Sequence, residues 1–470
     1  MKNELLVLFI QLFCEYQFLH IILEAVIKSM KKHILPLIVL LALIQTPSAF
    51  ALENGQTSLP KSGELNEKET EAVAPIDPQA APPLTLKITP KLFFGARLDL
   101  EARGDNNSDL NDAEEDSLVF LRSRLNLAGL YRPWDNIDFY GEVQFSYTHI
   151  LEDPSDRRSN ELQFALSRAY MLWKEFLTPS LNLQVGRQRF KDDREWLYDE
   201  NLDAVRTFFN RGPFSLELSA SANLVESEFS NNLIEPNDEE DVTINYILYN
   251  AYRYGRKDEI AFYGIVRQDP SEDQDLAFVG IYWKSRSIKH QKFWVEAASS
   301  LGFEESNSLM GLGVDLGWIS RFDLWLEPSL TMGFALGSKN FRQTGLEDNN
   351  GRFNGVVKFR YYGEVLDPEL SNIMIPTFGL GVIPFDRTSL DIVYHYYAQV
   401  EKTDELRDAN VDEDLTGEDR DLGHEVDLIF GTEIIKNVQI EFDAGVFIPG
   451  KAFPEDDLAY LGKLEFLIAF

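Results

Sequence analysis

From Lys87 to the C-terminus, apolar and polar residues alternate with a period of two. In residues 92–101 the even positions are apolar, while Arg97, Asp99 and Glu101 occupy odd positions. Successive side chains of a β-strand point to opposite faces, so this segment has one apolar and one charged face. The same pattern predicts further two-faced strands at 137–147, 214–224, 389–396 and 438–446.

A soluble β-sandwich would alternate in the same way, but other features favour a membrane barrel. The tract holds roughly sixteen to eighteen such strands, too many for one sandwich. A closed barrel also satisfies every backbone hydrogen bond in lipid. Residues 460–470 form an alternating strand that ends in Phe470. Aromatic residues at strand ends match the interfacial girdles of such barrels; they are Tyr131, Trp134, Trp173, Trp196, Tyr361, Tyr362 and Tyr396. We therefore predict an all-β fold, a single-chain transmembrane antiparallel β-barrel.

The N-terminal region divides into two parts before the barrel. Residues 30–51 read as a secretory signal, with Lys31 and Lys32, an apolar core and a cleavage site at Ala49–Ala51. We predict a signal peptide over 1–51, with Met30 as the true start; an uncleaved membrane anchor is the alternative. Residues 52–86 are rich in Pro, Glu, Ala, Lys and Ser, which predicts a disordered periplasmic lead-in. The barrel then occupies 87–470.

Composition excludes several function classes. The chain of 470 residues has a formal charge of −33, which argues against nucleic acid as a partner. Its one cysteine, Cys14, precedes the predicted cleavage site, so neither disulfides nor thiolate chemistry are expected. No G-x-S-x-G or H-E-x-x-H motif occurs, so we expect no enzyme activity, no cofactor and no bound metal. Residues 408–412 begin like a calcium loop, but Glu413 stands where such a loop needs glycine.

One stretch combines a strand with a dense run of charges. An alternating strand over 181–185 leads directly into Gly186–Arg206, GRQRFKDDREWLYDENLDAVR. In a soluble protein this run would be a solvated surface loop. In a barrel, a mixed-charge segment at a strand end can instead fold inward and line the pore.

Several segments in the correct order resemble the alginate export porin family of the outer membrane. They are Gly186–Asn201, Phe341–Glu347, Gly363–Glu364, Glu369–Asn372, His424–Leu428, Gly445–Gly450 and the final strand. The resemblance covers nearly all of 87–470. It implies an eighteen-stranded barrel that exports an anionic uronate polysaccharide through an arginine-rich constriction with acidic residues beside it.

Matching positions imply pore-lining residues that contact the polymer. They are Arg97, Arg124, Arg168, Arg189, Asp199, Glu226 and Glu465, with Arg352, Lys358 and Arg360 carried over as a group. The alternative for each arginine is a bracing pair with a carboxylate of the barrel wall. Arg168 shares the parity of Phe164 and Leu166, so it needs a β-bulge to face inward.

Two departures from the family pattern concern the polymer and its gating. Glu441 and Asp443 stand where the familiar alginate porin has arginines. The hairpin at Ile435–Val438 is short where that porin has a long periplasmic loop able to plug the pore.

The predicted function is export of an anionic exopolysaccharide, alginate or a similar uronate polymer, across the bacterial outer membrane. The main alternative is a porin for small organic acids or sugars. An adhesin or purely structural barrel would leave the inward arginines unexplained. Expected partners are the polysaccharide and outer-membrane lipid, and a periplasmic scaffold lipoprotein of an export complex is a candidate.

Overall fold

The computed structural model describes residues 81–470 apart from 112, 114–115, 153–159, 225–227, 231–241, 256, 271–272 and 305–306. The predicted signal peptide, the lead-in up to residue 80 and Glu226 therefore lie outside the described residues. The described part is all-β, and it contains no helix long and apolar enough to cross a membrane.

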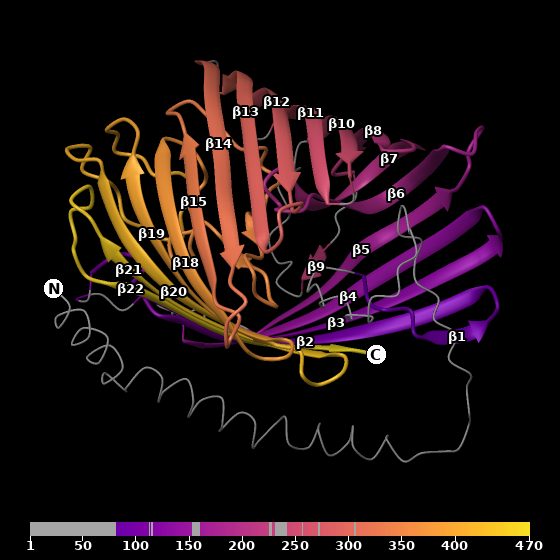
Figure 1. Ribbon diagram of the computed structural model, residues 1–470, viewed down its shortest axis with the longest axis horizontal. Helices are drawn as coiled ribbons and strands as arrows, with labels where there is room; N and C mark the ends of the chain where they lie inside the picture. The colour runs from indigo at the N-terminus through magenta and orange to yellow at the C-terminus, as the bar shows by residue number, and fades with distance from the viewer. Residues whose placement is uncertain are drawn as a thin grey trace. The chain divides into compact units, whose positions relative to one another are not determined.

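Eighteen antiparallel strands close into one barrel (Figure 1). The first and last strands close it, with Arg97 opposite Ala469 and Asn106 opposite Tyr460. This confirms the predicted fold. Around the barrel the strands are β2 (Leu92–Asn106), β3 (Leu118–Trp134), β4 (Ile137–Glu152), β5 (Glu161–Trp173), β6 (Leu181–Lys191), β7 (Asp199–Arg211), β8 (Phe214–Ala222), β10 (Ile244–Tyr254), β11 (Asp258–Asp269), β12 (Gln274–Ser285), β13 (Gln291–Glu304), β14 (Asn307–Arg321), β15 (Ser329–Gly337), β18 (Ile373–Phe385), β19 (Thr388–Gln399), β20 (Asp421–Thr432), β21 (Val438–Pro449) and β22 (Ala459–Ala469).

The alternation along these strands separates an apolar outer face from a charged inner face. Leu127 and Phe139 are 40% and 42% exposed on the outside, whereas Asp99 and Glu441 are 3% and 2% exposed on the inside. A soluble protein would bury the apolar set. The inverted distribution follows from lipid as the solvent of the outer face.

The two ends of the barrel differ in the length of their connections. Two-residue turns join β3 to β4, β7 to β8 and β18 to β19. The opposite end carries the long connections, including 338–372 and 400–420. Outer-membrane barrels have short periplasmic turns and long extracellular loops, so we assign the ends in that way. The directions of the strands on either side of 338–372 follow from the antiparallel pairing of β15 with β18.

The long segment 338–372, between β15 and β18, folds into the barrel and is here called the interior segment. It contains two short paired strands, β16 (Asn350–Gly351) and β17 (Phe359–Arg360). The carbonyl of Phe353 accepts a hydrogen bond from Lys292 Nζ of β13, and the N–H of Val356 donates to Ser389 Oγ of β19. Lys292 and Ser389 lie near the periplasmic ends of their strands. The interior segment therefore runs from the extracellular end almost to the periplasmic end.

The turn between β6 and β7, residues 192–198, packs against the interior segment. Trp196 Nε1 donates to the Tyr362 hydroxyl at 2.9 Å, and the N–H of Asp199 donates to the Leu346 carbonyl at 2.6 Å. Trp196, Tyr361 and Tyr362 are buried in this core. The prediction that these three belong to the interfacial girdles is therefore wrong. Their segments leave the wall and fill the lumen, where the aromatic rings pack against one another.

The wall between β5 and β6 is paired over only part of its height. Ala169–Trp173 of β5 pair with β6, but Gln163–Ala165 pair with β9 (Glu228–Ser230) instead. At the level where pairing stops, Gly186 has φ 116°, and a Cβ there would lie 2.3 Å from the Ala169 carbonyl oxygen. Only glycine fits this bend, which directs the upper half of the β6–β7 hairpin into the lumen.

The barrel begins with a short additional strand. β1 (Leu86–Thr89) pairs with the start of β2 below the end of β22. Leu84 packs against the buried cluster around Phe93 and Tyr140. The last residues of the predicted lead-in thus have a defined course beside β2.

Candidate functional site

A cavity of about 360 Å³ lies between the inner wall of the barrel and the interior segment. Strands β2–β7, β21 and β22 form the wall side, and residues 348–364 form the opposite side. Among the described residues, nine basic side chains line it: Arg97, Arg103, Arg122, Arg124, Arg168, Arg189, Lys358, Arg360 and Lys463. Eight acidic side chains accompany them: Asp99, Glu101, Glu142, Glu195, Asp348, Glu364, Glu441 and Glu465.

Arg124 is the centre of an ion-pair cluster on the wall. Its Nη2 atom lies 2.8 Å from Asp99 Oδ2, 3.1 Å from Glu101 Oε2 and 3.0 Å from Glu465 Oε1. These carboxylates come from β2 and β22, so the arginine bridges the strands that close the barrel. Arg97 also lines the cavity and is 5% exposed.

Arg168 faces the cavity because β5 contains a bulge. Glu142 pairs with Arg168 and Val143 with Leu166, which leaves Ser167 as the extra residue. The predicted bulge is confirmed. Arg168 Nε lies 3.7 Å from Glu142 Oε2.

The charged stretch Gly186–Arg206 forms the end of β6, the turn 192–198 and the start of β7. It lies inside the barrel, as the inward interpretation predicts, and is not a solvated surface loop. Arg189 Nε donates to Asp199 Oδ1 at 2.6 Å, and Lys191 Nζ lies 3.3 Å from Asp199 Oδ2. The Asp199 side chain is fully buried behind Arg189, whose side chain keeps 16% exposure. Arg189 therefore lines the cavity, while Asp199 holds it in place and does not line the cavity itself.

The interior segment contributes Lys358 and Arg360 from the opposite side. Lys358 pairs with Glu195, and Arg360 Nη1 lies 2.5 Å from Asp367 Oδ2. Arg352 does not line this cavity. It precedes Phe353 at the deep end of the segment, beside Lys292.

The cavity includes basic residues that sequence reasoning missed, namely Arg103, Arg122 and Lys463. Strand parity could have found them, because each shares a face with a candidate residue on its own strand. Lys463 Nζ lies 2.7 Å from both Glu441 Oε1 and Asp443 Oδ2. The two carboxylates that depart from the family pattern are thus paired with a lysine of the neighbouring strand.

One group of carboxylates has the proximity that a metal ion requires. Oxygen atoms of Glu195, Asp199 and Asp348 lie within 4.8 Å of one another. Lys191 contacts both Glu195 and Asp199, and Lys358 contacts Glu195. Side-chain cations therefore already balance much of the charge of this group.

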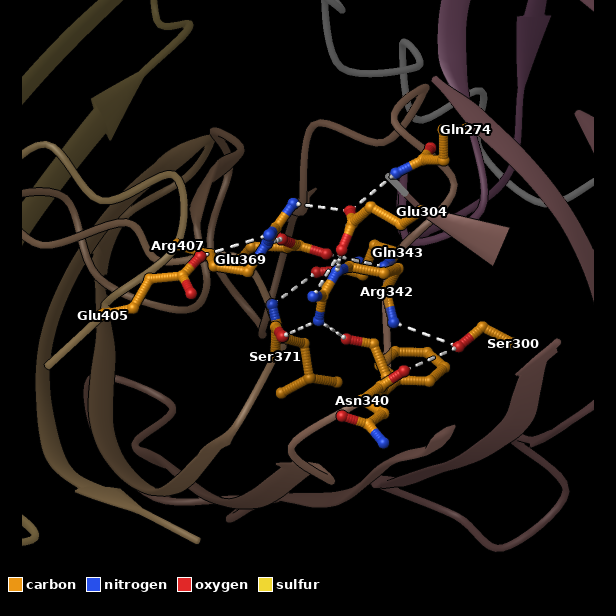
Figure 2. Close-up of polar contacts among 12 residues, drawn as sticks. Gln274, Ser300, Glu304, Asn340, Arg342, Gln343, Glu369, Ser371, Glu405 and Arg407 are labelled. Carbon is orange, nitrogen blue, oxygen red and sulfur yellow. Dashed lines mark hydrogen bonds and ion pairs between the residues drawn. The ribbon is translucent and has the colours of Figure 1, made fainter. Parts of the chain in front are cut away.

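A second polar network fastens the interior segment at the extracellular end (Figure 2). Glu304 at the end of β13 accepts from Arg342 at 2.8 Å and pairs with Arg407 at 3.2 Å. Arg407 also pairs with Glu369 at 3.0 Å, and Glu369 accepts from the N–H of Gln343 at 2.8 Å. The barrel wall, the interior segment and the loop 400–420 are joined by these contacts.

Glu347 gives the interior segment an expected pH dependence. Burial, and secondly the nearby Glu369, raise the pKa of Glu347 to about 7. The unfolded segment would release this proton near pH 4. The stabilisation that protonated Glu347 gives to the folded interior segment is therefore fully present below about pH 4, and it is lost as the pH rises through 7. Hydrogen exchange of residues 338–372 should accelerate beyond the intrinsic rate between about pH 4 and 7 and show no further excess above that, and Glu347→Gln should remove the excess. An equal acceleration in both proteins would contradict this assignment.

Comparison with known proteins gives matches in both sequence and fold. A family model described as "Alginate export" matches residues 91–465. The alginate production protein AlgE of Pseudomonas aeruginosa is 24% identical over 443 residues, covering 77% of this chain and 88% of that protein. AlgE of Pseudomonas syringae pv. tomato is 24% identical over 380 residues, covering 66% and 76%.

Solved structures with a similar fold come from Pseudomonas aeruginosa. OpdK, crystallised with vanillate, has a TM-score of 0.52 at 10% identity, covering 80% of this chain and 98% of its own. OccD3 (OpdP) has a TM-score of 0.52 at 11% identity, covering 84% and 94%. At these identities the likeness concerns the barrel fold alone.

Proposed function

The chain belongs to the alginate export family, and we propose that it is an outer-membrane channel that exports alginate or a similar uronate polymer. The protein resides in the bacterial outer membrane, where the apolar outer face of its barrel contacts lipid. The observation that carries the proposal is the cavity inside a closed barrel, lined by nine basic side chains.

The polymer path that we propose passes the candidate residues that line this cavity. A guanidinium group binds carboxylates through two parallel hydrogen bonds, which suits a uronate. Conduction also requires binding weak enough for release. The carboxylates paired with Arg124, Arg168 and Arg189 compete for the same donors and so weaken the hold on each uronate. No step of this transport requires a catalytic group, and we propose no enzyme activity.

A porin for small organic acids or sugars is the second candidate. It is favoured by the cavity volume of about 360 Å³, which falls within the range of pockets for small molecules. The two candidates differ in what occupies the cavity, because a polymer threads through it in a chain while a small solute enters and leaves singly.

Oligouronates of defined length separate these functions in a planar bilayer. With the purified protein reconstituted, uronate hexamers added on the short-turn side should interrupt the current, with interruptions that shorten as the driving voltage rises. Maltohexaose, which is neutral, should interrupt it far less. Current that passes monomeric acids but ignores uronate oligomers would overturn the export proposal in favour of a small-solute porin.

Two further proposals concern the periplasmic side. We propose that residues 1–51 are a cleaved signal peptide, and an N-terminus other than Leu52 on the mature protein would refute this. We also propose a periplasmic scaffold lipoprotein as partner. Co-purification from crosslinked cells should recover a lipoprotein, and its absence would remove that partner.

A further inference from the structure

The stretch Ala81–Leu84, just ahead of β1, lies on the inner face of the barrel at its periplasmic end. Gly95 has the same parity on β2 as Arg97, which lines the cavity, so a side chain at position 95 would point into the lumen. A Cβ atom added at Gly95 would lie 2.0 Å from the carbonyl oxygen of Pro83. The backbone of the stretch therefore rests directly on the inner wall, at a position where the strand has no side chain.

The wall beneath this stretch is apolar and aromatic. Ala81 and Leu84 pack against a group of inward-facing side chains, here called the aromatic face. Its members are Phe93, Ala128, Leu130, Tyr140 and Tyr170. The rings of Tyr140 and Tyr170 are stacked, with 5.1 Å between their centroids. Pro82 is buried, and neither proline of the stretch has an N–H group that an apolar wall would leave without a partner.

The aromatic face leads directly into the cavity. Tyr140 and Glu142 are neighbours on the inner face of β4, and Tyr170 and Arg168 are neighbours on that of β5. Both Glu142 and Arg168 line the cavity. The Tyr140 hydroxyl donates a hydrogen bond to Glu142 Oε2 at 2.8 Å. The polymer path that we propose through the cavity therefore begins, on the periplasmic side, at the aromatic face.

The interior segment occupies another side of the lumen at this end. It contacts Lys292 of β13 and Ser389 of β19, whereas Ala81–Leu84 lie against β2–β5. The interior segment is fastened by ion pairs such as that of Arg342 with Glu304. The contacts of Ala81–Leu84 with the aromatic face are apolar, and the Pro83 carbonyl accepts from the nearby Thr85 N–H. Of the two, Ala81–Leu84 are the easier for an entering chain to displace.

We propose that the aromatic face is the first binding site of the exported polymer, and that Ala81–Leu84 are a cover which the polymer displaces. This inference rests on the proposed export function. A pyranose ring has an apolar face of C–H groups that packs against an aromatic ring, while its hydroxyl groups remain hydrated. The prolines and Leu84 present a similar apolar surface, so they can take the place of a sugar while no polymer is present.

Gly95→Ala tests the cover in the full-length chain. The added methyl group meets the Pro83 carbonyl and should lift the cover, whereas β2 itself accepts alanine because Gly95 lacks the positive φ that favours glycine. In a planar bilayer, uronate hexamers added on the short-turn side should interrupt the current about tenfold more often, because a covered site binds in proportion to its uncovered fraction. Gly141→Ala on β4, whose Cβ would meet nothing within 4 Å, is the matched control and should behave as wild type.

Two further variants separate a binding site from a simple plug. Adding Tyr170→Leu to Gly95→Ala should return the interruptions to about the wild-type frequency without changing the conductance in salt. In Pro82→Cys protein, the thiol at this buried position should react with a maleimide faster when the uronate hexamer is present, because the hexamer lifts the cover.

Each part of the proposal can fail separately. An unchanged interruption frequency in folded Gly95→Ala protein would overturn the cover, and Leu84→Ser, which weakens the same apolar contact, replaces this variant if it does not fold. A high frequency that persists after Tyr170→Leu would overturn the binding site and leave a steric plug. Interruptions in none of these proteins, wild type included, would refute export itself.

Discussion

Arg194→Met should raise the single-channel conductance several-fold while the barrel stays folded. The guanidinium of Arg194 stacks 4.3 Å from the Trp294 ring and 4.1 Å from the Tyr361 ring, and it lies 2.8 Å from Asp315 Oδ2. This contact joins the β6–β7 turn and the interior segment to the far wall. Removing one partner of a buried ion pair typically costs about 3–5 kcal/mol.

The lost free energy destabilises the packing inside the lumen and not the barrel wall, because the hydrogen bonds between wall strands do not involve Arg194. The inner segments should therefore detach and widen the channel. Arg321→Met is the matched control, since the Arg321 side chain is 39% exposed and pairs with Glu327 at the periplasmic end. Conductance equal to wild type in a folded Arg194→Met protein would show that this contact does not hold the lumen closed.

Arg189→Glu should reduce the permeability of anions relative to cations by about tenfold and abolish polymer secretion. The change reverses a charge in a lining that is nearly balanced, so the cavity becomes acidic. It also places a carboxylate against Asp199, which Lys191 continues to neutralise. Arg189→Gln removes the charge without adding repulsion, so it should lower the relative anion permeability and polymer secretion by a smaller amount.

The measurements are the reversal potential in a salt gradient and secretion by cells lacking the native protein. Lys436→Glu changes the net charge by the same amount as Arg189→Glu, but on an exposed periplasmic turn. It should leave the reversal potential and secretion unchanged. Normal selectivity and secretion in folded Arg189→Glu protein would mean that Arg189 only braces the wall.

Alternation was sufficient to predict the wall of the barrel and much of its lining. Arg97, Asp99 and Glu101 share one parity on β2, and all three face the cavity. Arg103 continues the same face, so the rule extends to residues that were not singled out. This works because a regular strand offers each side chain only two directions.

The rule could not predict the contents of the lumen. Arg189 has the parity of Leu183 and Val185, which would place it on the lipid face of a regular strand. The bend at Gly186 turns that face toward the cavity, and a single glycine in a sequence does not reveal the direction of a bend. Arg352, Lys358 and Arg360 were predicted only as a group, because their segment shows no strand alternation. How deep Arg352 lies in the lumen depends on tertiary contacts alone.

The contents of the lumen also dictate an order of assembly. The barrel closes by pairing β2 with β22, which is synthesised after every other strand of the barrel. The interior segment extends almost the full depth of the barrel and packs its aromatic side chains there. Threading so bulky a segment through a finished ring would mean dragging its polar backbone past the extracellular rim. It must instead settle onto the open sheet, so that β22 completes a cylinder already filled along one side.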